Sequence, residues 1–413
     1  MPAPPPALPE SHFTTLFLDL NSYFASVEQQ LNPALRGRPV AVIPVETDTT
    51  CCIAASYEAK AYGVKTGTNV AEARRMCPGI VFVSTRTDAY VRFHHRIIAA
   101  VESVLPVHQV FSIDEMSCRL VGSQQHPEAA LALARCVKEV IYSRVGECLR
   151  CSIGLATNRF LAKLAADMQK PDGLVTISRA DLPHKILGLV PRDLCGIGPR
   201  MEERLRRRGI TTMAHLLALD ERAMVDAWGS VVGLRYHRWL RGDDPQEAPT
   251  RKRSIGHQHV MPPELRTADG ARAVLARLIH KAAARSRHVG WLARKMTIWI
   301  KFHGGGDWSI DIPLESSVDT LELIHLFTDR WPPTLSGVPH CVGVTLHDLE
   351  KEDLIPLPLF PQEQKRQKLA RAMDSLNNKY GLHAIYPAAM HTTRDAAPAR
   401  IGFTSIPDLD MPE

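Results

Sequence analysis

The sequence lacks the features that mark several classes of protein. No hydrophobic run approaches the length of a membrane span, and nine cysteines are spread over 413 residues without a paired framework. No internal repeat is present, and the proline-rich start has neither the basic beginning nor the apolar core of a signal peptide. We therefore expect a disordered leader over residues 1–12 and a soluble, cytoplasmic protein without a membrane partner.

One pair of cysteines has the spacing that is found in some zinc and redox sites. Cys148 and Cys151 form a CxxC, but no second CxxC and no histidine pair lies beside it. A zinc or redox site is therefore the less favoured interpretation, and small residues leading into a strand are favoured.

Composition sets the scale of the molecule and the kind of partner it favours. A chain of 413 residues with 45% hydrophobic content can form two to four domains with real cores. The net charge of +6 and the pI of about 8.8 favour a polyanionic partner without establishing one.

The first 180 residues alternate between short apolar runs and amphipathic segments, which predicts a mixed α and β region. The expected strands are 14–20, 38–44, 80–84, 107–111, 115–120 and 150–156. The expected helices are 23–31, 57–62, 88–104 and 127–145.

The pattern changes twice further along the chain. Strand-like runs vanish from about 184 to 241, and a proline-containing, charged linker follows at 242–252. A new αβ unit begins at about 253. Its expected helices are 272–287 and 318–330, its expected strands are 295–302, 308–314 and 340–347, and a final helix is expected at 362–381.

Three acidic residues suggest a metal site. Asp19 ends an apolar run, and Asp114-Glu115 lies between two runs that can pair as a hairpin. A carboxylate at the end of a buried strand is costly unless a cation meets it. Carboxylate oxygens are the ligands that magnesium prefers, and two such ions can assist an in-line displacement. Taken singly, however, a strand-end aspartate is more typical of a cap, and an Asp-Glu pair of a solvated turn.

A second group of side chains suits a triphosphate. Tyr57 and Lys60 lie in one segment, and Lys170 precedes Pro171 in another. A phenol and ammonium groups can neutralise the charge that develops when phosphate bonds break. Without the carboxylates, both lysines would be interpreted as surface residues.

A glycine-rich turn followed by arginines suggests a phosphate-binding hairpin. Gly196 and Gly198 would allow close approach of the backbone to a phosphate, at the start of a helix that carries Arg200 and Arg204. Such contacts grip the sugar-phosphate chain without reading its sequence. The alternative is a glycine turn before a solvated basic helix.

Together these segments resemble the Y-family (translesion) DNA polymerases, and are similar to the DinB, or polymerase IV, group with a UmuC-like C-terminal extension. The segments occur in the family's order over about residues 13–350. The segments that carry the resemblance are 17–28 (FLDLNSYFASVE), 56–60 (SYEAK), 62–64 (YGV), 112–115 (SIDE), 152–159 (SIGLATNR), 162–173 (AKLAADMQKPDG), 196–198 (GIG) and 252–256 (KRSIG).

The resemblance implies an α+β multidomain fold shaped as a right hand, with a ferredoxin-like palm, small fingers, a helical thumb with a helix-hairpin-helix, and an αβ little finger. The implied parts are a palm at 13–22 and 89–177, fingers at 23–88, a thumb at 178–241, a linker at 242–252, a little finger at 253–349 and a C-terminal tail at 350–413.

The resemblance also implies roles at the active site. Asp19 and Asp114 would bridge two Mg²⁺ ions, Glu115 would hold the ion nearer the primer, and the carbonyl of Leu20 would complete the other. Phe24 would be the steric gate that leaves no room for a ribose 2′-hydroxyl. Further contacts would be made to the triphosphate by Tyr57, Lys60 and Lys170, and to DNA by Gly196, Gly198, Arg200, Arg204, Lys252 and Arg253.

Departures from the family's pattern affect nucleotide affinity rather than the metal ligands. Many relatives have arginine where Lys60 stands, so a bidentate phosphate contact would become a point contact. Asn21 and Ser22 stand where acidic or aromatic residues are frequent.

A short apolar segment near the carboxyl end resembles a peptide that binds the sliding clamp. Leu357, Leu359 and Phe360 provide the apolar side chains, but Pro356 replaces the usual leading glutamine. A packed loop is the alternative interpretation of this segment.

The resulting expectation is a template-directed, low-fidelity DNA polymerase for translesion synthesis. It would act as a monomer on primer-template DNA and deoxynucleoside triphosphates, with the bacterial sliding clamp as a further partner. One alternative is a non-catalytic polymerase-like scaffold, but such relatives typically lose the metal carboxylates that this chain keeps. A helix-hairpin-helix repair protein with other chemistry is the other alternative, and it leaves the first 180 residues unexplained.

Overall fold

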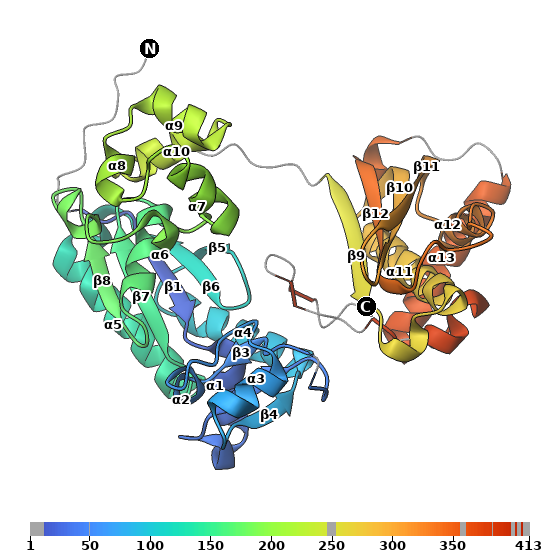
Figure 1. Cartoon of the computed structure of the whole chain (residues 1–413), viewed down its shortest axis with the longest axis horizontal. Coiled ribbons are helices and arrows are strands. Elements are labelled where there is room, and N and C mark those ends of the chain that lie inside the picture. Colours follow the sequence, from blue (N-terminus) through green and yellow to red (C-terminus); the bar gives the residue numbers. More distant parts are fainter. Residues whose placement is uncertain are drawn as a thin grey trace. The chain divides into compact units, whose positions relative to one another are not determined.

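The computed structural model describes residues 12–48, 50–245, 253–355, 361–381, 383–397, 401–402 and 406–407. The chain divides into two compact units, one up to Glu247 and one from Ala248 to Arg400, and the short segment Ile401–Ile406 is grouped with the first. Figure 1 shows the helices and strands of both units. Each unit has its own hydrophobic core and is described by itself.

The first unit is built on a five-stranded sheet. The strand order is β5 (Val107–Val110), β6 (Glu115–Arg119), β1 (Thr15–Leu20), β7 (Cys151–Ala156) and β8 (Leu174–Ile177). β1 runs antiparallel to both of its neighbours, while β7 and β8 are parallel. The predicted hairpin of β5 and β6 is confirmed, and Asp114 lies in its turn.

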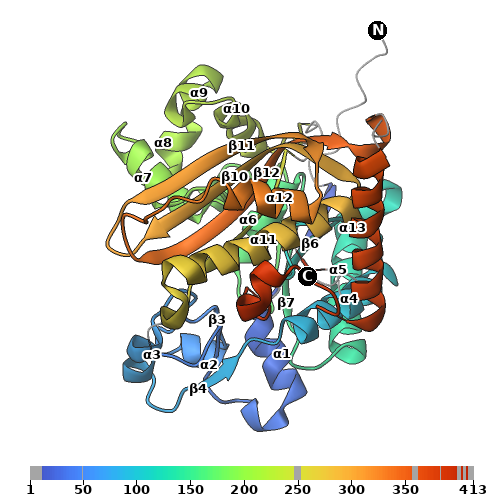
Figure 2. The same ribbon diagram turned by 90° about the vertical axis from the view of Figure 1, so that its right-hand side faces the viewer.

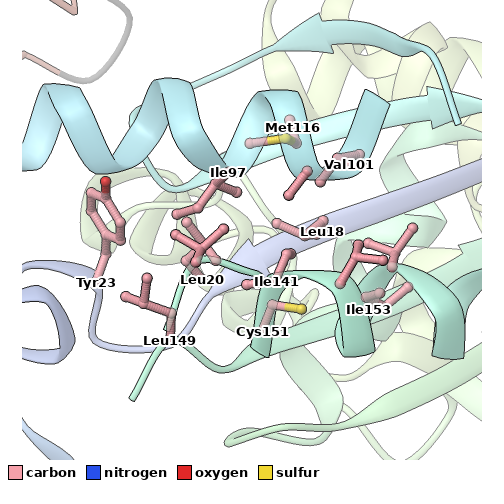
Figure 3. Packing of buried hydrophobic residues seen from close by; sticks show 14 of the residues in the cluster. Leu18, Leu20, Tyr23, Ile97, Val101, Met116, Ile141, Leu149, Cys151 and Ile153 are labelled. Atoms are coloured by element: carbon pink, nitrogen blue, oxygen red, sulfur yellow. The ribbon is translucent and has the colours of Figure 1, made fainter. Parts of the chain in front are cut away.

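Alternation along β1 sends its side chains to two different cores. Leu16, Leu18 and Leu20 enter the larger core of the unit, where helices α4 (Thr87–Glu102) and α5 (Pro127–Arg144) pack. Figure 3 shows Leu18 and Leu20 among Ile97, Ile141 and Ile153. Phe17 belongs to the core on the other face, and the period of two places Asp19 on that same face.

Helix α6 (Arg159–Met168) covers the face of the sheet that carries Phe17 and Asp19. Asn158 caps its first turn, because its side-chain oxygen accepts a hydrogen bond from the backbone N–H of Leu161 at 2.8 Å. The helix lies very close to β7 at Gly154, where an added Cβ would be 1.9 Å from the carbonyl oxygen of Ala162. Glycine at this position therefore sets the height of α6 above the sheet.

A small three-stranded sheet forms a separate layer of the first unit. Its order is β3 (Ala54–Ala55), β2 (Val40–Ile43) and β4 (Val81–Ser84), and β2 and β4 are parallel. The helices of this part are α1 (Tyr23–Leu31), α2 (Tyr57–Lys60) and α3 (Val70–Met76). Buried alanines, Val64, Val70 and Cys77 pack against this sheet in a compact core of their own.

The segment 178–245 contains no strand, which confirms the prediction made for about 184–241. Its α-helices are α7 (Pro199–Arg206), α8 (Met213–Leu217), α9 (Glu221–Trp228) and α10 (Val232–Trp239). Their apolar faces share a core with α6, in which Phe160 stacks on Trp239 with ring centroids 5.2 Å apart.

The second unit is a four-stranded antiparallel sheet covered by helices. Figure 2 shows helices α11 (Ala268–His288) and α12 (Thr320–Thr328) over one face of the sheet. The strand order is β11 (Asp307–Ser317), β10 (Trp291–Phe302), β12 (Pro339–Lys351) and β9 (Ser254–Val260).

The carboxyl-terminal region is packed rather than loose where the structure describes it. Helix α13 (Pro361–Tyr380) is joined to α11 by a bidentate ion pair between Arg287 and Asp374, at 2.7 and 2.8 Å. A short 3-10 helix, Ala388–Thr393, also covers α11 and buries Met390 in the second core. Residues 383–397, which the resemblance assigned to a C-terminal tail, are thus a structural part of the second unit.

The helices and strands expected from the sequence are all present, with ends that move by a few residues. Helices α3 and α6 and strands β3, β8 and β9 were not predicted. Within the described residues, none of the helices combines the length and the apolar character that a membrane crossing needs.

We predict that Gly154→Ala lowers the free energy of unfolding by about 3 kcal/mol, because the new methyl group must push the backbone of α6 away from β7. Urea denaturation followed by circular dichroism measures the change. Gly188→Ala is the matched control, since an added Cβ there meets nothing within 4 Å. Equal stability of the two variants would contradict this account of the contact.

Candidate active site

The three predicted carboxylates lie at one edge of the five-stranded sheet. Asp19 in β1 is directly opposite Glu115 in β6, and the backbone N–H of Leu20 donates to the carbonyl of Asp114 at 2.8 Å. The side chain of Asp19 is only 6% exposed, while that of Glu115 is 28% exposed. Residues almost a hundred positions apart are therefore neighbours, because β1 and β6 are adjacent strands.

Burial makes this concentration of negative charge costly. It raises the pKa of Asp114, a hydrogen bond from Ser112 opposes the rise, and the charge of Asp19 adds to it. Burial likewise raises the pKa of Glu115, although the ammonium of Lys163 lowers it. In both carboxylates burial outweighs the contacts that oppose it, so the folded protein disfavours their ionised forms.

Two lysines contact the carboxylates. Lys163 of α6 approaches Asp19, Glu115 and Asp167, with its Nζ 2.9 Å from Glu115 Oε1 and 3.1 Å from Asp167 Oδ1. Lys170 lies 2.7 Å from Asp19 Oδ1 and 2.8 Å from Asp167 Oδ1. Burial disfavours the charge on Lys170, but the neighbouring carboxylates of Asp19 and Asp167 raise its pKa.

Asn21 ties β1 to the loop that carries Lys170. Its Oδ1 accepts a hydrogen bond from the backbone N–H of Asp172 at 2.7 Å, and its Nδ2 donates to Ser152 Oγ at 3.1 Å. The peptide bond from Lys170 to Pro171 is cis. A residue that departs from the family's pattern thus has a clear structural task in this chain, since it fixes the backbone beside Lys170.

Tyr57 and Lys60 lie on the short helix α2, which is capped by Ser56. The Nζ of Lys60 is 4.3 Å from the centroid of the Tyr57 ring. Burial and the positive charge of Lys170 lower the pKa of Lys60. The two ammonium groups therefore act on each other, and an anion between them would relieve their repulsion.

Phe24 is held by aromatic neighbours at the start of α1. Its ring stacks on Tyr90 with centroids 4.5 Å apart, and the hydroxyl of Tyr23 donates to the backbone carbonyl of Tyr90 at 2.7 Å. Tyr90 in turn donates to Glu28 Oε1 at 2.8 Å. The half-buried ring of Phe24 is thus part of a rigid wall rather than a mobile side chain.

The donor set suits a hard divalent cation. Asp19, Asp114 and Glu115 offer carboxylate oxygens, and the backbone carbonyl of Leu20 is the remaining candidate ligand. In the part of the chain that the structure describes, acidic, histidine and cysteine side chains nowhere converge in threes as a ready metal site. At this edge of the sheet the lysines occupy carboxylate oxygens that a metal would use.

The predicted phosphate-binding hairpin has the backbone that the glycines suggested. Gly196 has φ +87°, and a Cβ there would lie 2.4 Å from the hydroxyl oxygen of Tyr236. Gly198 is the residue before α7, whose exposed face carries Arg200 and Arg204. These residues belong to the helical part of the first unit and do not contact the carboxylates.

The remaining predicted contacts lie elsewhere. Arg253 is exposed just before β9, in the second unit. Four predicted residues fall outside the described residues, namely Lys252, Leu357, Leu359 and Phe360.

Two residues of the site were not predicted from the sequence. Lys163 and Asp167 were quoted within a motif, but no role was given to them. Their spacing of four residues on one helix is the signal that was available, since such a pair shares a face. Only the position of α6 over Asp19 shows that this face meets the carboxylates.

We predict that Asp114→Asn stabilises the protein by about 1 kcal/mol at pH 7 in EDTA, because the neutral amide avoids the cost of a buried charge. With a raised pKa, the folded state binds the proton more tightly than the unfolded state. Stability of the wild type therefore falls as the pH rises between the unfolded and folded pKa values, and the gain of the variant disappears at acid pH.

Urea unfolding of the wild type and the variant at several pH values measures this difference. Asp226→Asn, at an exposed position of α9, is the control and should change little at any pH. A variant that is less stable than the wild type at pH 7 would refute the electrostatic argument.

The sequence of the chain matches those of known proteins. Residues 18–167 match the impB/mucB/samB family, and residues 252–358 match the C-terminal domain of that family. DNA polymerase IV of Moorella thermoacetica is 38% identical over 394 residues, which cover 92% of this chain and 97% of that protein. DNA polymerase IV of Pelotomaculum thermopropionicum is 33% identical over 389 residues, covering 91% and 95%.

Solved structures show the same fold. A Y-family DNA polymerase chimera superposes with a TM-score of 0.68 at 24% identity, and DinB from Sulfolobus solfataricus with a TM-score of 0.53 at 23% identity. Each covers 81% of this chain and 98% of its own. The predicted α+β multidomain fold, with a separate C-terminal sheet, is thereby confirmed. On these matches the chain belongs to the DNA polymerase IV group of the Y family, and it is a DNA-directed DNA polymerase of the translesion class.

Proposed function

We propose that this chain extends a primer by two-magnesium nucleotidyl transfer at Asp19, Asp114 and Glu115. The observation that carries the proposal is the position of these carboxylates at one edge of the sheet, where Lys170 contacts Asp19. The DNA polymerase IV family generally uses divalent metal ions, and the oxygen donors of this site fit magnesium. We place the ions at the three carboxylates and the Leu20 carbonyl.

In the proposed reaction the primer 3′-oxygen forms a bond to the α-phosphorus of a deoxynucleoside triphosphate, and the bond to the pyrophosphate oxygen breaks. The hydroxyl proton passes to water or to a phosphate. Bound magnesium supplies Lewis acidity for the hydroxyl and for the leaving pyrophosphate. The carboxylates of Asp19 and Glu115 would hold the cations at the sheet edge, and no protein general base is needed.

The triphosphate is proposed to lie against Tyr57, Lys60 and Lys170. Lys60 and Lys170 repel each other, so a polyanion between them gains from both charges. Their ammonium groups are point charges, so they can contact the phosphates without the fixed bidentate geometry of an arginine. The proposed gate is Phe24, whose stacking on Tyr90 gives it the rigidity that steric exclusion requires.

DNA is proposed to run along the phosphate-binding hairpin at Gly196 and Gly198, with Arg200 and Arg204 on its sugar-phosphate backbone. Lys252 and Arg253 would add contacts from the start of the second unit. The corresponding parts are a palm at 13–22 and 89–177, fingers at 23–88, a thumb at 178–241, and a little finger at 253–349. A clamp-binding peptide at 356–360 remains part of this proposal.

We predict that Asp114→Asn abolishes primer extension while DNA binding is retained. Removing a ligand of the proposed metal pair costs several kcal/mol of transition-state stabilisation, or about a thousandfold in rate. Single-nucleotide incorporation with magnesium, and fluorescence anisotropy with labelled primer-template DNA, measure the two properties. Asp226→Asn is the control for both.

The outcome separates the polymerase reaction from the scaffold alternative. Extension by the wild type that is lost in Asp114→Asn supports the proposed site. DNA binding without extension by either protein would favour a non-catalytic scaffold and overturn the proposal. Extension by the purified Asp114→Asn variant at the wild-type rate would show that the chemistry occurs elsewhere.

We predict that Phe24→Ala admits ribonucleotides, since the flat wall that excludes the 2′-hydroxyl is removed. The preference for deoxynucleotides should fall by about a hundredfold or more, measured as the ratio of kcat/KM values. Tyr23→Phe is the control, because it removes one hydrogen bond to the backbone of Tyr90 and keeps both rings. An unchanged preference for deoxynucleotides in Phe24→Ala would show that Phe24 is not the steric gate.

A further inference from the structure

Lys163 is the more buried of the two lysines that contact the carboxylates of the proposed site. Its side chain is only 12% exposed, and its ammonium group contacts three different carboxylates, those of Asp19, Glu115 and Asp167. An ammonium has three N–H donors, so this set of acceptors uses all of them. The ammonium group also lies over an aromatic ring, with Nζ 5.5 Å from the centroid of Phe17 on β1.

Two of these acceptors are proposed metal ligands, and the third is not. Asp19 and Glu115 face each other across β1 and β6, whereas Asp167 lies one helical turn after Lys163 on α6. Asp167 also contacts Lys170 at 2.8 Å. Lys163 therefore has two partners at the sheet edge and Lys170 has one, and both lysines also contact Asp167.

A lysine ammonium and a divalent cation cannot occupy the same carboxylate oxygens together. Both are attracted by the same charge, and they repel each other at the distances of direct contact. Binding of a cation at Asp19 and Glu115 must therefore move the ammonium of Lys163. Since this side chain is buried, leaving it without a carboxylate would be costly, and Asp167 is already within 3.1 Å.

We propose that Lys163 competes with the divalent cation for Asp19 and Glu115, and that Asp167 is the acceptor to which its ammonium transfers when the cation binds. Lys163 is thus a positioning residue that sets the affinity of the site for metal. It keeps the carboxylates in place and limits the binding of a cation that arrives without a nucleotide. This inference rests on the proposed metal site.

The test is titration of the full-length protein with Mn²⁺, without DNA or nucleotide, followed by electron paramagnetic resonance of the free ion. The variants are Lys163→Met, Asp167→Asn, the double variant, and Asp19→Asn. Lys185→Met is the matched control, because it removes the same charge from a lysine whose nearest carboxylate is Asp181, away from the site. Lys163→Gln provides a second version of the main variant, in case the methionine is not tolerated.

We expect Lys163→Met to bind Mn²⁺ about tenfold more tightly than the wild type, because a positive charge next to the cation is removed. Asp167→Asn should bind about threefold more weakly, since the displaced ammonium then has no second charged acceptor. The double variant should bind nearly as tightly as Lys163→Met. Lys185→Met should bind like the wild type.

Three results would overturn the inference. Equal or weaker binding by both Lys163 variants would contradict competition. The double variant could bind Mn²⁺ more weakly than Lys163→Met, by the same factor by which Asp167→Asn binds it more weakly than the wild type. The two substitutions would then act independently, and no transfer would occur. Unchanged binding in Asp19→Asn, by contrast, would refute the proposed metal site itself, and the inference with it.

Discussion

The antiparallel pairing of β1 with β6 brings Asp19 to Glu115, and the site is built around this pairing. It concentrates negative charge at a partly buried edge of the sheet, where burial already raises the pKa values of Asp114 and Glu115. Such an arrangement needs cations nearby. Lys163 from α6 and Lys170 from the following loop provide them.

The close contact of α6 with β7 determines where the lysine of α6 lies. Gly154 lets the helix backbone approach the strand, and this approach brings Lys163 over the side of the sheet that carries Phe17 and Asp19. Side chains along β1 alternate between the two faces of the sheet, so the leucines enter one core and Asp19 lies on the face that α6 covers. A single small residue in a strand therefore matters to the charge balance of a site that it does not touch.

The same architecture explains why stability and activity oppose each other at Asp114. A buried carboxylate that is short of positive charge weakens the folded state, yet oxygen ligands of this kind are what a magnesium ion requires. The lysines reduce the cost without removing it. Competition between an ammonium and a metal for the same oxygens is the physical consequence, and Asp167 gives the displaced charge a place within the site.

The sequence by itself determined most of the helices and strands in their order, the position of the carboxylates at strand ends, and the family, because apolar periodicity and motif order are local properties of the chain. It also placed Gly196 in a tight turn, where φ is +87°. Only the tertiary structure decided that Lys163 meets Asp19, that Asn21 holds the Lys170 loop, and that the residues after 381 cover α11. These contacts join residues far apart in the chain, and they depend on strand register and on the height of α6 above the sheet, neither of which a local pattern encodes.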